Sequence, residues 1–309
     1  MHKIYVSTCS AFIKTLFLQK TYFEKSFSEK SYSMEFVDRG KEQKRLKRAF
    51  ESETKKFVVI YGRRRLGKST LLKRVISDED VYFEAGRQET QVQISLLAGT
   101  IANSYSGFDM PLYPTWESVL VAFNKVCREN TVLVLDEFPY MVEKDSSLPS
   151  VLQHILDSGE LRYNLVICGS SQRMMQHFVL DSTDPLYGRA HEKMNLRPIR
   201  PQHWQEAMHL DAVSTIEEYS VWGGVPRYWT LREEYPSLCE AINELILDEH
   251  GILYGEPSAL FIDEANDIAP FQSIMTALGH GNTRYSAVAS AIGKKTTEIS
   301  KPLNALTAM

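Results

Sequence analysis

The chain has 309 residues, a formal net charge of −4 and 43% hydrophobic residues. This length provides for one large domain or two smaller ones with a packed core. A slightly acidic chain is not coated with positive charge, so any contact with nucleic acid must be confined to a local patch. No segment reaches the roughly 18 uninterrupted apolar residues of a membrane-spanning helix, and the four cysteines show no CxxC spacing. We therefore expect a cytoplasmic protein without a membrane partner.

Residues 1–33 lack a clean helical or strand period, and an organised region begins at Met34. We expect 1–33 to be an N-terminal tail and Met34 to be the natural start, which mass spectrometry of the native protein would test. Next, charged residues surround Leu46, Ala49 and Phe50 at helical spacing. This pattern predicts a short amphipathic helix over 41–50.

Residues 57–77 combine an apolar run, a GxxxxGKS sequence and a helical pattern in the order that a phosphate-binding loop requires. Backbone N–H groups of such a loop converge on phosphate, its lysine contacts the β- and γ-phosphates, and its serine hydroxyl can bind Mg²⁺. The three arginines of the loop either help to hold phosphate or are solvated charges. The predicted nucleotide-binding residues are Gly62, Arg63, Arg64, Arg65, Leu66, Gly67, Lys68, Ser69 and Thr70.

Strand and helix patterns then alternate along the chain. Continuous apolar runs are typical of strands that are buried on both faces of a parallel sheet. The strands are expected at 57–61, 81–85, 132–135, 165–168 and 193–196, and helices at 90–105, 116–129, 149–158 and 171–180. The order predicts an α/β fold with a parallel doubly wound sheet and its ligand at the carboxyl ends of the strands.

Helical patterns alone follow residue 200. Helices are expected near 201–209, 214–222, 226–233, 237–249, 267–279, 284–292 and 295–306. We therefore predict an ATPase-like α/β domain over 34–200, a helical segment over 201–265 and a last segment over 266–309.

An acidic pair follows the third strand. Asp136 and Glu137 stand where the strand's carboxyl end faces the phosphate loop. Together with Ser69, Asp136 is predicted to bind Mg²⁺, and Glu137 is predicted to orient the attacking water. The alternative, that the pair merely ends a buried strand in solvent, does not account for the loop upstream.

Two further positions remain open between a catalytic and a structural interpretation. Ser170 follows the fourth strand and either senses the γ-phosphate or caps a helix. Arg189 either reaches a γ-phosphate, in its own chain or a neighbour's, or forms a surface salt bridge.

Several ordered motifs together resemble the prokaryotic, mainly archaeal-type ATPase family of the STAND and AAA+-like branch of P-loop NTPases. They are Phe36-Val37-Asp38-Arg39, the phosphate loop, Leu-Asp-Glu-Phe at 135–138, Cys-Gly-Ser-Ser at 168–171, Pro-Leu-Tyr-Gly-Arg at 185–189 and Gly-Gly-Val-Pro at 223–226. The resemblance extends from about Met34 to the C-terminus.

This resemblance implies an AAA+-like P-loop fold with a helical lid. Phe36, Val37 and Arg39 would line the adenine pocket, although Asp38 replaces the glycine of the related motif. Pro226 would contact the nucleotide from the lid, unless the Gly-x-Pro element is a plain turn between helices.

In the family a winged helix-turn-helix follows the lid, so residues 266–309 resemble a partial, truncated form of it. Its basic residues, which would contact DNA phosphates, are Arg284, Lys294, Lys295 and Lys301. The chain ends before a wing could form.

The expected function is Mg²⁺-dependent hydrolysis of ATP to ADP and phosphate by a nucleotide-dependent switch. Lys68, Glu137 and Arg189 are the predicted catalytic residues, and a homo-oligomer or a protein partner is compatible with the sequence. Two alternatives remain, namely an ATP-gated DNA-binding module and a catalytically idle fragment of a larger ATPase.

Overall fold

The computed structural model describes residues 36–175, 178, 181–264 and 267–308. The predicted tail over 1–33 and the choice between Met1 and Met34 lie outside the described residues. The chain divides into two units, Met1–Val37 and Asp38–Met309, and the elements below belong to the second unit.

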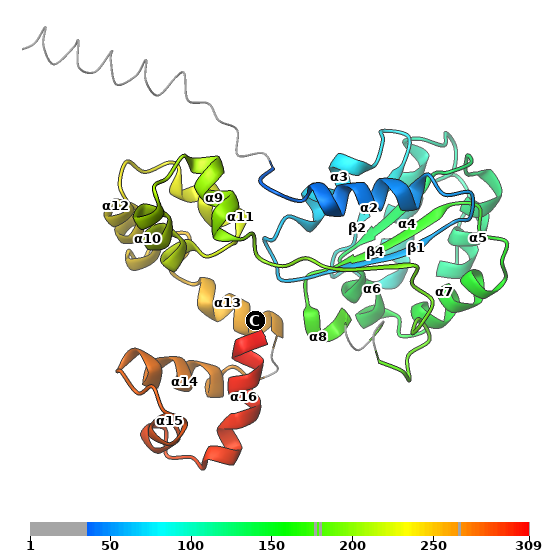
Figure 1. The fold of residues 1–309 in the computed structure, drawn as a ribbon. Coiled ribbons are helices and arrows are strands. Elements are labelled where there is room, and N and C mark those ends of the chain that lie inside the picture. Colours follow the sequence, from blue (N-terminus) through cyan, green and yellow to red (C-terminus); the bar gives the residue numbers. More distant parts are fainter. Residues whose placement is uncertain (1–35, 176–177, 179–180, 265–266, 309) are drawn as a thin grey trace, which may run out of the picture. The chain divides into compact units, whose positions relative to one another are not determined.

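A five-stranded parallel sheet forms the centre of the α/β part (Figure 1). Its strand order is β2-β3-β4-β1-β5, and all four strand pairs are parallel. The strands are β1 (Phe57–Tyr61), β2 (Val81–Glu84), β3 (Val132–Asp136), β4 (Asn164–Gly169) and β5 (Glu192–Asn195). The predicted parallel sheet is confirmed, and β4 lies between the strand before the phosphate loop and the strand that carries the acidic pair.

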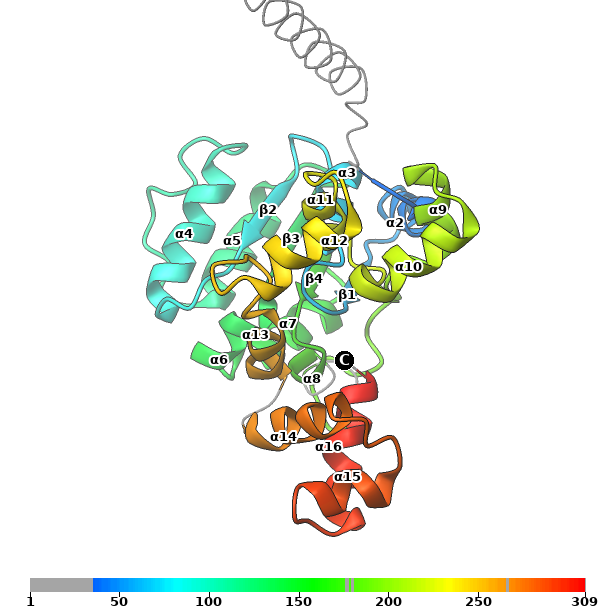
Figure 2. The ribbon, with the colours of Figure 1, turned by 90° about the vertical axis from the view of Figure 1, so that its left-hand side faces the viewer.

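Helices cover both faces of this sheet, as Figures 1 and 2 show. Side chains alternate between the two faces of a strand, and every residue of β3 and β4 is buried. One face carries α2 (Gly40–Phe50) and α3 (Lys68–Val75), and the other carries α4 (Thr90–Ala102), α5 (Trp116–Val126), α6 (Phe138–Lys144) and α7 (Leu148–Asp157).

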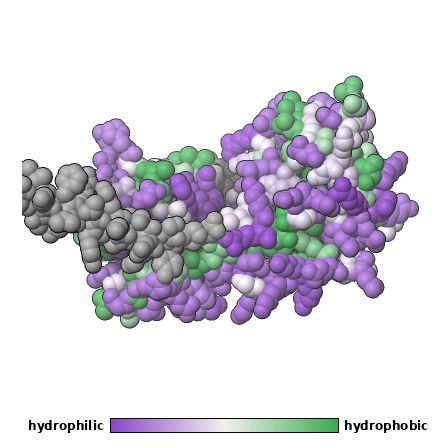
Figure 3. Space-filling view, turned by 90° about the horizontal axis from the view of Figure 1, so that it is seen from above, coloured by the Kyte–Doolittle hydropathy of each residue, from purple (hydrophilic) through white to green (hydrophobic). Residues whose placement is uncertain are grey.

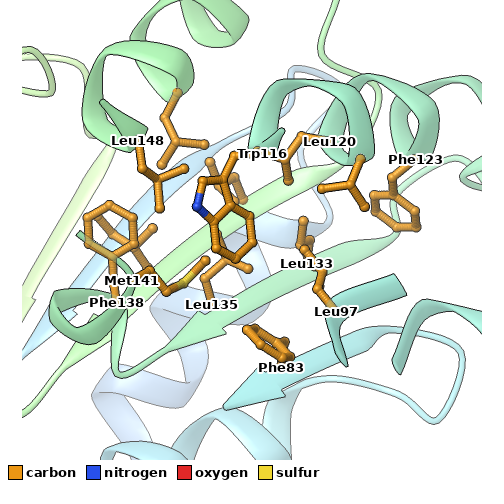
Figure 4. Packing of buried hydrophobic residues seen from close by; sticks show 14 of the residues in the cluster. Phe83, Leu97, Trp116, Leu120, Phe123, Leu133, Leu135, Phe138, Met141 and Leu148 are labelled. Carbon is orange, nitrogen blue, oxygen red and sulfur yellow. The ribbon is translucent and has the colours of Figure 1, made fainter. Parts of the chain in front are cut away.

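The larger hydrophobic core lies between the sheet and helices α4 to α7 (Figure 4). Trp116 lies at its centre among Leu120, Leu148 and Leu135. The helix that carries Trp116 begins at a capping box, in which Thr115 accepts a hydrogen bond from the Ser118 N–H. This core buries one face of β3 and β4, whose carboxyl ends lie at the predicted site.

A buried amide fixes the opposite, amino-terminal edge of the sheet. The Asn164 side chain is fully buried and accepts a hydrogen bond from the Lys56 N–H at 2.9 Å. It donates to the Phe50 and Asn130 carbonyl oxygens at 3.3 and 3.5 Å. One side chain therefore satisfies backbone groups of three separate segments, as buried polar groups require.

Helices follow β5 to the end of the described chain. They are α9 (Pro201–Met208), α10 (Ala212–Trp222), α11 (Pro226–Arg232), α12 (Leu238–Ile242), the π-helical η2 (Asn243–Leu247), α13 (Glu256–Glu264), α14 (Ala269–Gly279), α15 (Tyr285–Ala291) and α16 (Thr296–Ala308). Every helix expected after residue 200 is present, and α13 was not predicted. Before the sheet's last strand, α6 was likewise not predicted, and of the helix expected over 171–180 the structure describes α8 (Gln172–Met175).

Three buried tryptophans form the core of helices α9, α10 and α11. Trp204 and Trp229 stack with their ring centroids 4.6 Å apart, and both are buried together with Trp222. Trp222 also donates to the buried Glu218 carboxylate at 2.7 Å. These tryptophans are therefore core anchors.

The last three helices share a small hydrophobic cluster of their own. It consists of Ile274, Ala277, Val288, Ala289 and Ile299. The proposed boundaries at 200 and 266 remain predictions, since the only division within the chain falls after Val37.

Hydrophilic residues predominate on the face shown in Figure 3, where apolar residues form separate small groups. Over the described residues, each helix is too short or too polar to cross a bilayer.

Candidate nucleotide-binding site

The phosphate loop connects β1 to α3, and its two glycines occupy special backbone positions. Gly62 has φ 146°, and a Cβ there would lie 2.5 Å from the Leu196 carbonyl oxygen at the end of β5. Gly67 has φ 83°, and a Cβ there would meet no heavy atom within 4 Å. The first glycine therefore permits close packing of the loop on the sheet, while the second leaves space beside the helix start.

The start of α3 is suited to bind an anion. The first helical hydrogen bond is donated by the Leu71 N–H to the Gly67 carbonyl oxygen at 2.9 Å, and no side chain caps the helix. The N–H groups of Lys68, Ser69 and Thr70 precede that bond and point along the axis. Lys68 is buried, and its ammonium donates to the Gly62 and Arg63 carbonyl oxygens at 2.8 and 3.0 Å. Positive charge and N–H donors thus converge at one place.

Asp136 lies directly beside this helix start. Its carboxylate is 1% exposed, and Oδ2 accepts the Ser69 hydroxyl at 2.7 Å. Oδ1 accepts the Glu137 N–H at 2.9 Å. The structure therefore brings together the two residues that the sequence predicted as Mg²⁺ ligands.

Their donor set fits a magnesium ion bound with a nucleotide. The Ser69 hydroxyl donates its hydrogen bond to Asp136, so the lone pairs of Ser69 Oγ remain for a cation. Among the described residues no three His, Cys, Asp or Glu side chains gather as a metal site. A hydroxyl, one carboxylate and substrate phosphates are the ligand set that Mg²⁺ uses in such proteins.

Glu137 is held by Ser170, the residue that follows β4. Its backbone is left-handed, with φ 52°, and its Oε1 accepts the Ser170 hydroxyl at 2.5 Å. The Ser170 N–H donates to Glu137 Oε2 at 3.3 Å. The neighbouring Ser171 accepts the Met174 N–H at 3.3 Å, so Ser171 caps α8 and Ser170 orients the predicted catalytic carboxylate.

Arg39 connects the phosphate loop to the segment after β5. It is 4% exposed and donates to the Leu66 carbonyl oxygen at 3.3 Å and to the Arg197 carbonyl oxygen at 2.7 Å. The predicted adenine contacts Phe36 and Val37 belong to the other unit of the chain, so their relation to the loop stays a prediction.

The loop also contacts the helices that follow the sheet. Arg65 forms a 2.6 Å ion pair with Glu256 at the start of α13, and this carboxylate is only 8% exposed. Tyr228 donates to Glu256 at 2.8 Å, and burial, with the Glu256 carboxylate, raises the pKa of Tyr228 to about 12. Because Tyr228 lies in the first turn of α11, which Pro226 begins, this helix end is linked to the loop through Glu256. The lid contact predicted for Pro226 itself stays a prediction.

Arg189 lies away from the phosphate loop of its own chain. Its guanidinium donates to both carboxylate oxygens of Asp157 at 2.8 and 2.7 Å. Two residues later, the His191 N–H donates to the Phe57 carbonyl oxygen, at the start of β1, whereas the loop follows the end of this strand, about 13 Å away at 3.3 Å per residue. The structure supports the salt-bridge interpretation and does not support a role in cis; a role on a neighbour's nucleotide stays a prediction.

Two side chains that the sequence did not single out join the site. Tyr82 on β2 donates a hydrogen bond to Asp136 Oδ2, and burial, with the charge of Asp136, raises the pKa of its hydroxyl well above its usual value. Glu256 lies far along the chain in a helix that was not predicted. The only available signal for Tyr82 was its place in the strand expected at 81–85, and none pointed to Glu256.

This combination of strand, glycine loop, helix start and acidic strand end is the arrangement of a P-loop nucleotide-binding domain. The chain belongs to the family of ATPase domains found predominantly in Archaea, whose family model matches residues 36–228.

The chain is also similar to individual proteins. An uncharacterized protein of Methanocaldococcus jannaschii is 28% identical over 278 residues, which cover 88% of this chain and 60% of that protein. This chain therefore spans about three fifths of that relative. The solved structure of a Walker-type ATPase from Pyrococcus abyssi is similar at a TM-score of 0.65 and 18% identity, over 87% of this chain and 89% of the other. A STAND protein from Pyrococcus horikoshii with a tetratricopeptide repeat sensor gives 0.47 at 15% identity, over 88% and 38%.

Proposed function

We propose that this ATPase binds ATP together with Mg²⁺, hydrolyses it to ADP and phosphate, and acts as a nucleotide-dependent switch. The observation that carries the proposal is the 2.7 Å hydrogen bond between Ser69 and Asp136. It joins a hydroxyl at the start of the phosphate-binding helix to a buried carboxylate on another strand.

Each residue has a defined part in this proposal. The N–H groups of Lys68, Ser69 and Thr70 and the Lys68 ammonium bind the phosphates, while Ser69 and Asp136 hold Mg²⁺. When bound, Mg²⁺ neutralises charge that develops on the phosphate oxygens. Glu137 accepts a proton from the attacking water and orients it, and Ser170 fixes the direction of that carboxylate.

Two substitutions test binding and hydrolysis separately. We expect Lys68→Ala to abolish nucleotide binding in titration calorimetry, and Glu137→Gln to bind ATP but to release no phosphate. Lys44→Ala on the exposed side of α2 and Glu143→Gln on the exposed side of α6 are matched controls. Phosphate release by Glu137→Gln at the wild-type rate would contradict the role of Glu137. ATP binding by wild-type protein without any phosphate release would favour the idle-fragment alternative.

The contacts of Arg65 support the switch. Nucleotide phosphates and the Glu256 carboxylate both carry negative charge and both lie within reach of the loop's arginines. Because Glu256 also accepts a hydrogen bond from Tyr228, a change at the loop is expected to reach α11 and α13. Hydrogen exchange of these two helices with and without nucleotide tests this, and unchanged exchange in both would contradict it.

The last three helices favour a second candidate function, ATP-gated DNA binding. Four residues, 292–295, separate α15 from α16 and include Gly293, which is the form of a helix-turn-helix connection. The basic side chains around this turn are all exposed: Arg284, Lys294, Lys295 and Lys301. A helix-turn-helix with such charges can contact the phosphates of duplex DNA.

DNA binding is tested with duplex DNA at several salt concentrations. We expect salt-dependent binding that is weakened by the double substitution of Lys294 and Lys295 to alanine and lost on deletion of 266–309. The double substitution of Lys44 and Lys47 on α2, both exposed, is the control. Binding that does not respond to either change in the C-terminal helices would contradict this candidate.

A further inference from the structure

The buried Asp136 carboxylate accepts three hydrogen bonds, and one comes from a residue with no part in the motifs. Oδ2 accepts the Ser69 and Tyr82 hydroxyls, and Oδ1 accepts the Glu137 N–H. Ser69 and Glu137 belong to the phosphate loop and the acidic pair. Tyr82 comes from β2, the edge strand of the sheet beside β3.

The Tyr82 side chain does not point into the main hydrophobic core. Its neighbours Val81 and Phe83 are buried in the main core, so Tyr82 faces the other side of the sheet. There the Lys73 ammonium of α3 lies over the ring, 4.7 Å from its centroid. The ring is therefore held by β2 and α3, and this leaves the hydroxyl directed at Asp136.

We propose that Tyr82 positions the ligands of Mg²⁺. Its hydroxyl fixes the Asp136 carboxylate in the orientation that accepts the hydrogen bond from the Ser69 hydroxyl. The inference rests on the proposed Mg²⁺-dependent binding of ATP at this site.

Three donors on two oxygens leave the carboxylate little freedom to rotate. If the Tyr82 hydroxyl is removed, Oδ2 loses one of its two hydroxyl donors and keeps Ser69, whose own orientation depends on Asp136. The orientation of the Ser69 hydroxyl is then no longer fixed by its acceptor, and the affinity for Mg²⁺ decreases. Residues that orient metal ligands typically account for a tenfold to hundredfold change in metal affinity. The phosphate contacts of the loop do not involve Tyr82 and remain.

The test compares nucleotide affinity with and without the metal. A non-hydrolysable ATP analogue is titrated calorimetrically into each protein, once in excess Mg²⁺ and once in EDTA. We expect Tyr82→Phe to reduce the gain in affinity on adding Mg²⁺ by about tenfold while the affinity in EDTA stays unchanged.

Tyr163→Phe is the matched control. Tyr163 is fully buried in the main core, and its hydroxyl has no hydrogen-bond partner among the described residues. This variant should keep the full wild-type gain. The comparison separates the general effect of removing a hydroxyl from a buried tyrosine from the specific effect of removing it at Tyr82.

Each outcome decides the matter. A full gain in Tyr82→Phe, with a normal gain in wild type, overturns the role of Tyr82 and leaves the proposed function standing. Equal losses in Mg²⁺ and in EDTA show a role in folding and also overturn it. A wild-type protein that gains nothing from Mg²⁺ overturns both the proposed function and this inference.

Discussion

The ion pair between Arg65 and Glu256 is expected to stabilise the protein, and a double-mutant cycle measures by how much. Glu256→Gln removes the charge but keeps an oxygen that can accept the Tyr228 hydrogen bond. Arg65→Gln removes the partner charge without introducing a glycine or proline into the loop. The double variant completes the cycle, so the interaction energy is the departure from additivity.

The structure sets the expected size of this interaction. Glu256 is 8% exposed and Arg65 29% exposed, with 2.6 Å between their charged atoms. Fully buried pairs cost about 3–5 kcal/mol when one partner is lost, and exposed pairs about 0.2–1 kcal/mol. Solvent at Arg65 screens the interaction, so a coupling of about 2 kcal/mol is expected between these limits.

The assay is denaturant-induced unfolding of the four proteins without nucleotide. A second cycle on the more exposed Arg189–Asp157 pair serves as the control, and we expect a smaller coupling there because water and salt screen it. If the Arg65 and Glu256 effects add to within about 0.5 kcal/mol, the pair does not join α13 to the loop and the reasoning fails.

Three further predictions concern the turn before α11, the candidate site and acid stability. Gly224→Ala should lower the free energy of unfolding by about 1–3 kcal/mol, because its Cβ would lie 2.2 Å from a backbone oxygen. Gly279→Ala, which has open space around its Cβ, should not lower it. Equal effects of the two substitutions in thermal melts would contradict this. Ser170→Ala should slow phosphate release about tenfold or more by freeing Glu137, while ATP affinity changes little; a parallel loss of affinity would argue against it. At the cap of α10, a serine hydroxyl and two backbone N–H groups lower the pKa of Asp211 below its usual 3.8. Its stabilisation is present above pH 3.8 and is lost as the pH falls below it, so Asp211→Asn should flatten the acid limb of stability against pH.

Local patterns were sufficient to predict the elements whose residues carry a clear period. All five strands fall within a residue or two of the expected ranges. In β1, β3 and β4 the continuous apolar runs reflect burial on both faces. The proximity of Ser69 to Asp136 was also predictable, since carboxyl ends of parallel strands meet at one edge. Helix α6, which begins directly after the acidic pair, was not predicted.

Other parts of the site depend on tertiary contacts that leave no local pattern. Glu256 is one acidic residue at the start of a helix, and its partner Arg65 lies far away in sequence. Tyr82 occupies a strand position that suits any aromatic residue, and only the pairing of β2 with β3 brings its hydroxyl to Asp136. The sequence motif around Arg189 did not show which group its side chain contacts. In the structure its orientation is set by the ion pair with Asp157.

The place of β4 in the sheet has a consequence for which positions of the fold tolerate substitution. This strand hydrogen-bonds to β1 on one side and to β3 on the other, so a displacement along its axis alters two sets of spacings together. A comparable displacement of β5, which borders only β1, alters one. Variation within the middle of the sheet should therefore be the most strictly limited, and new properties are expected to arise first at its margins.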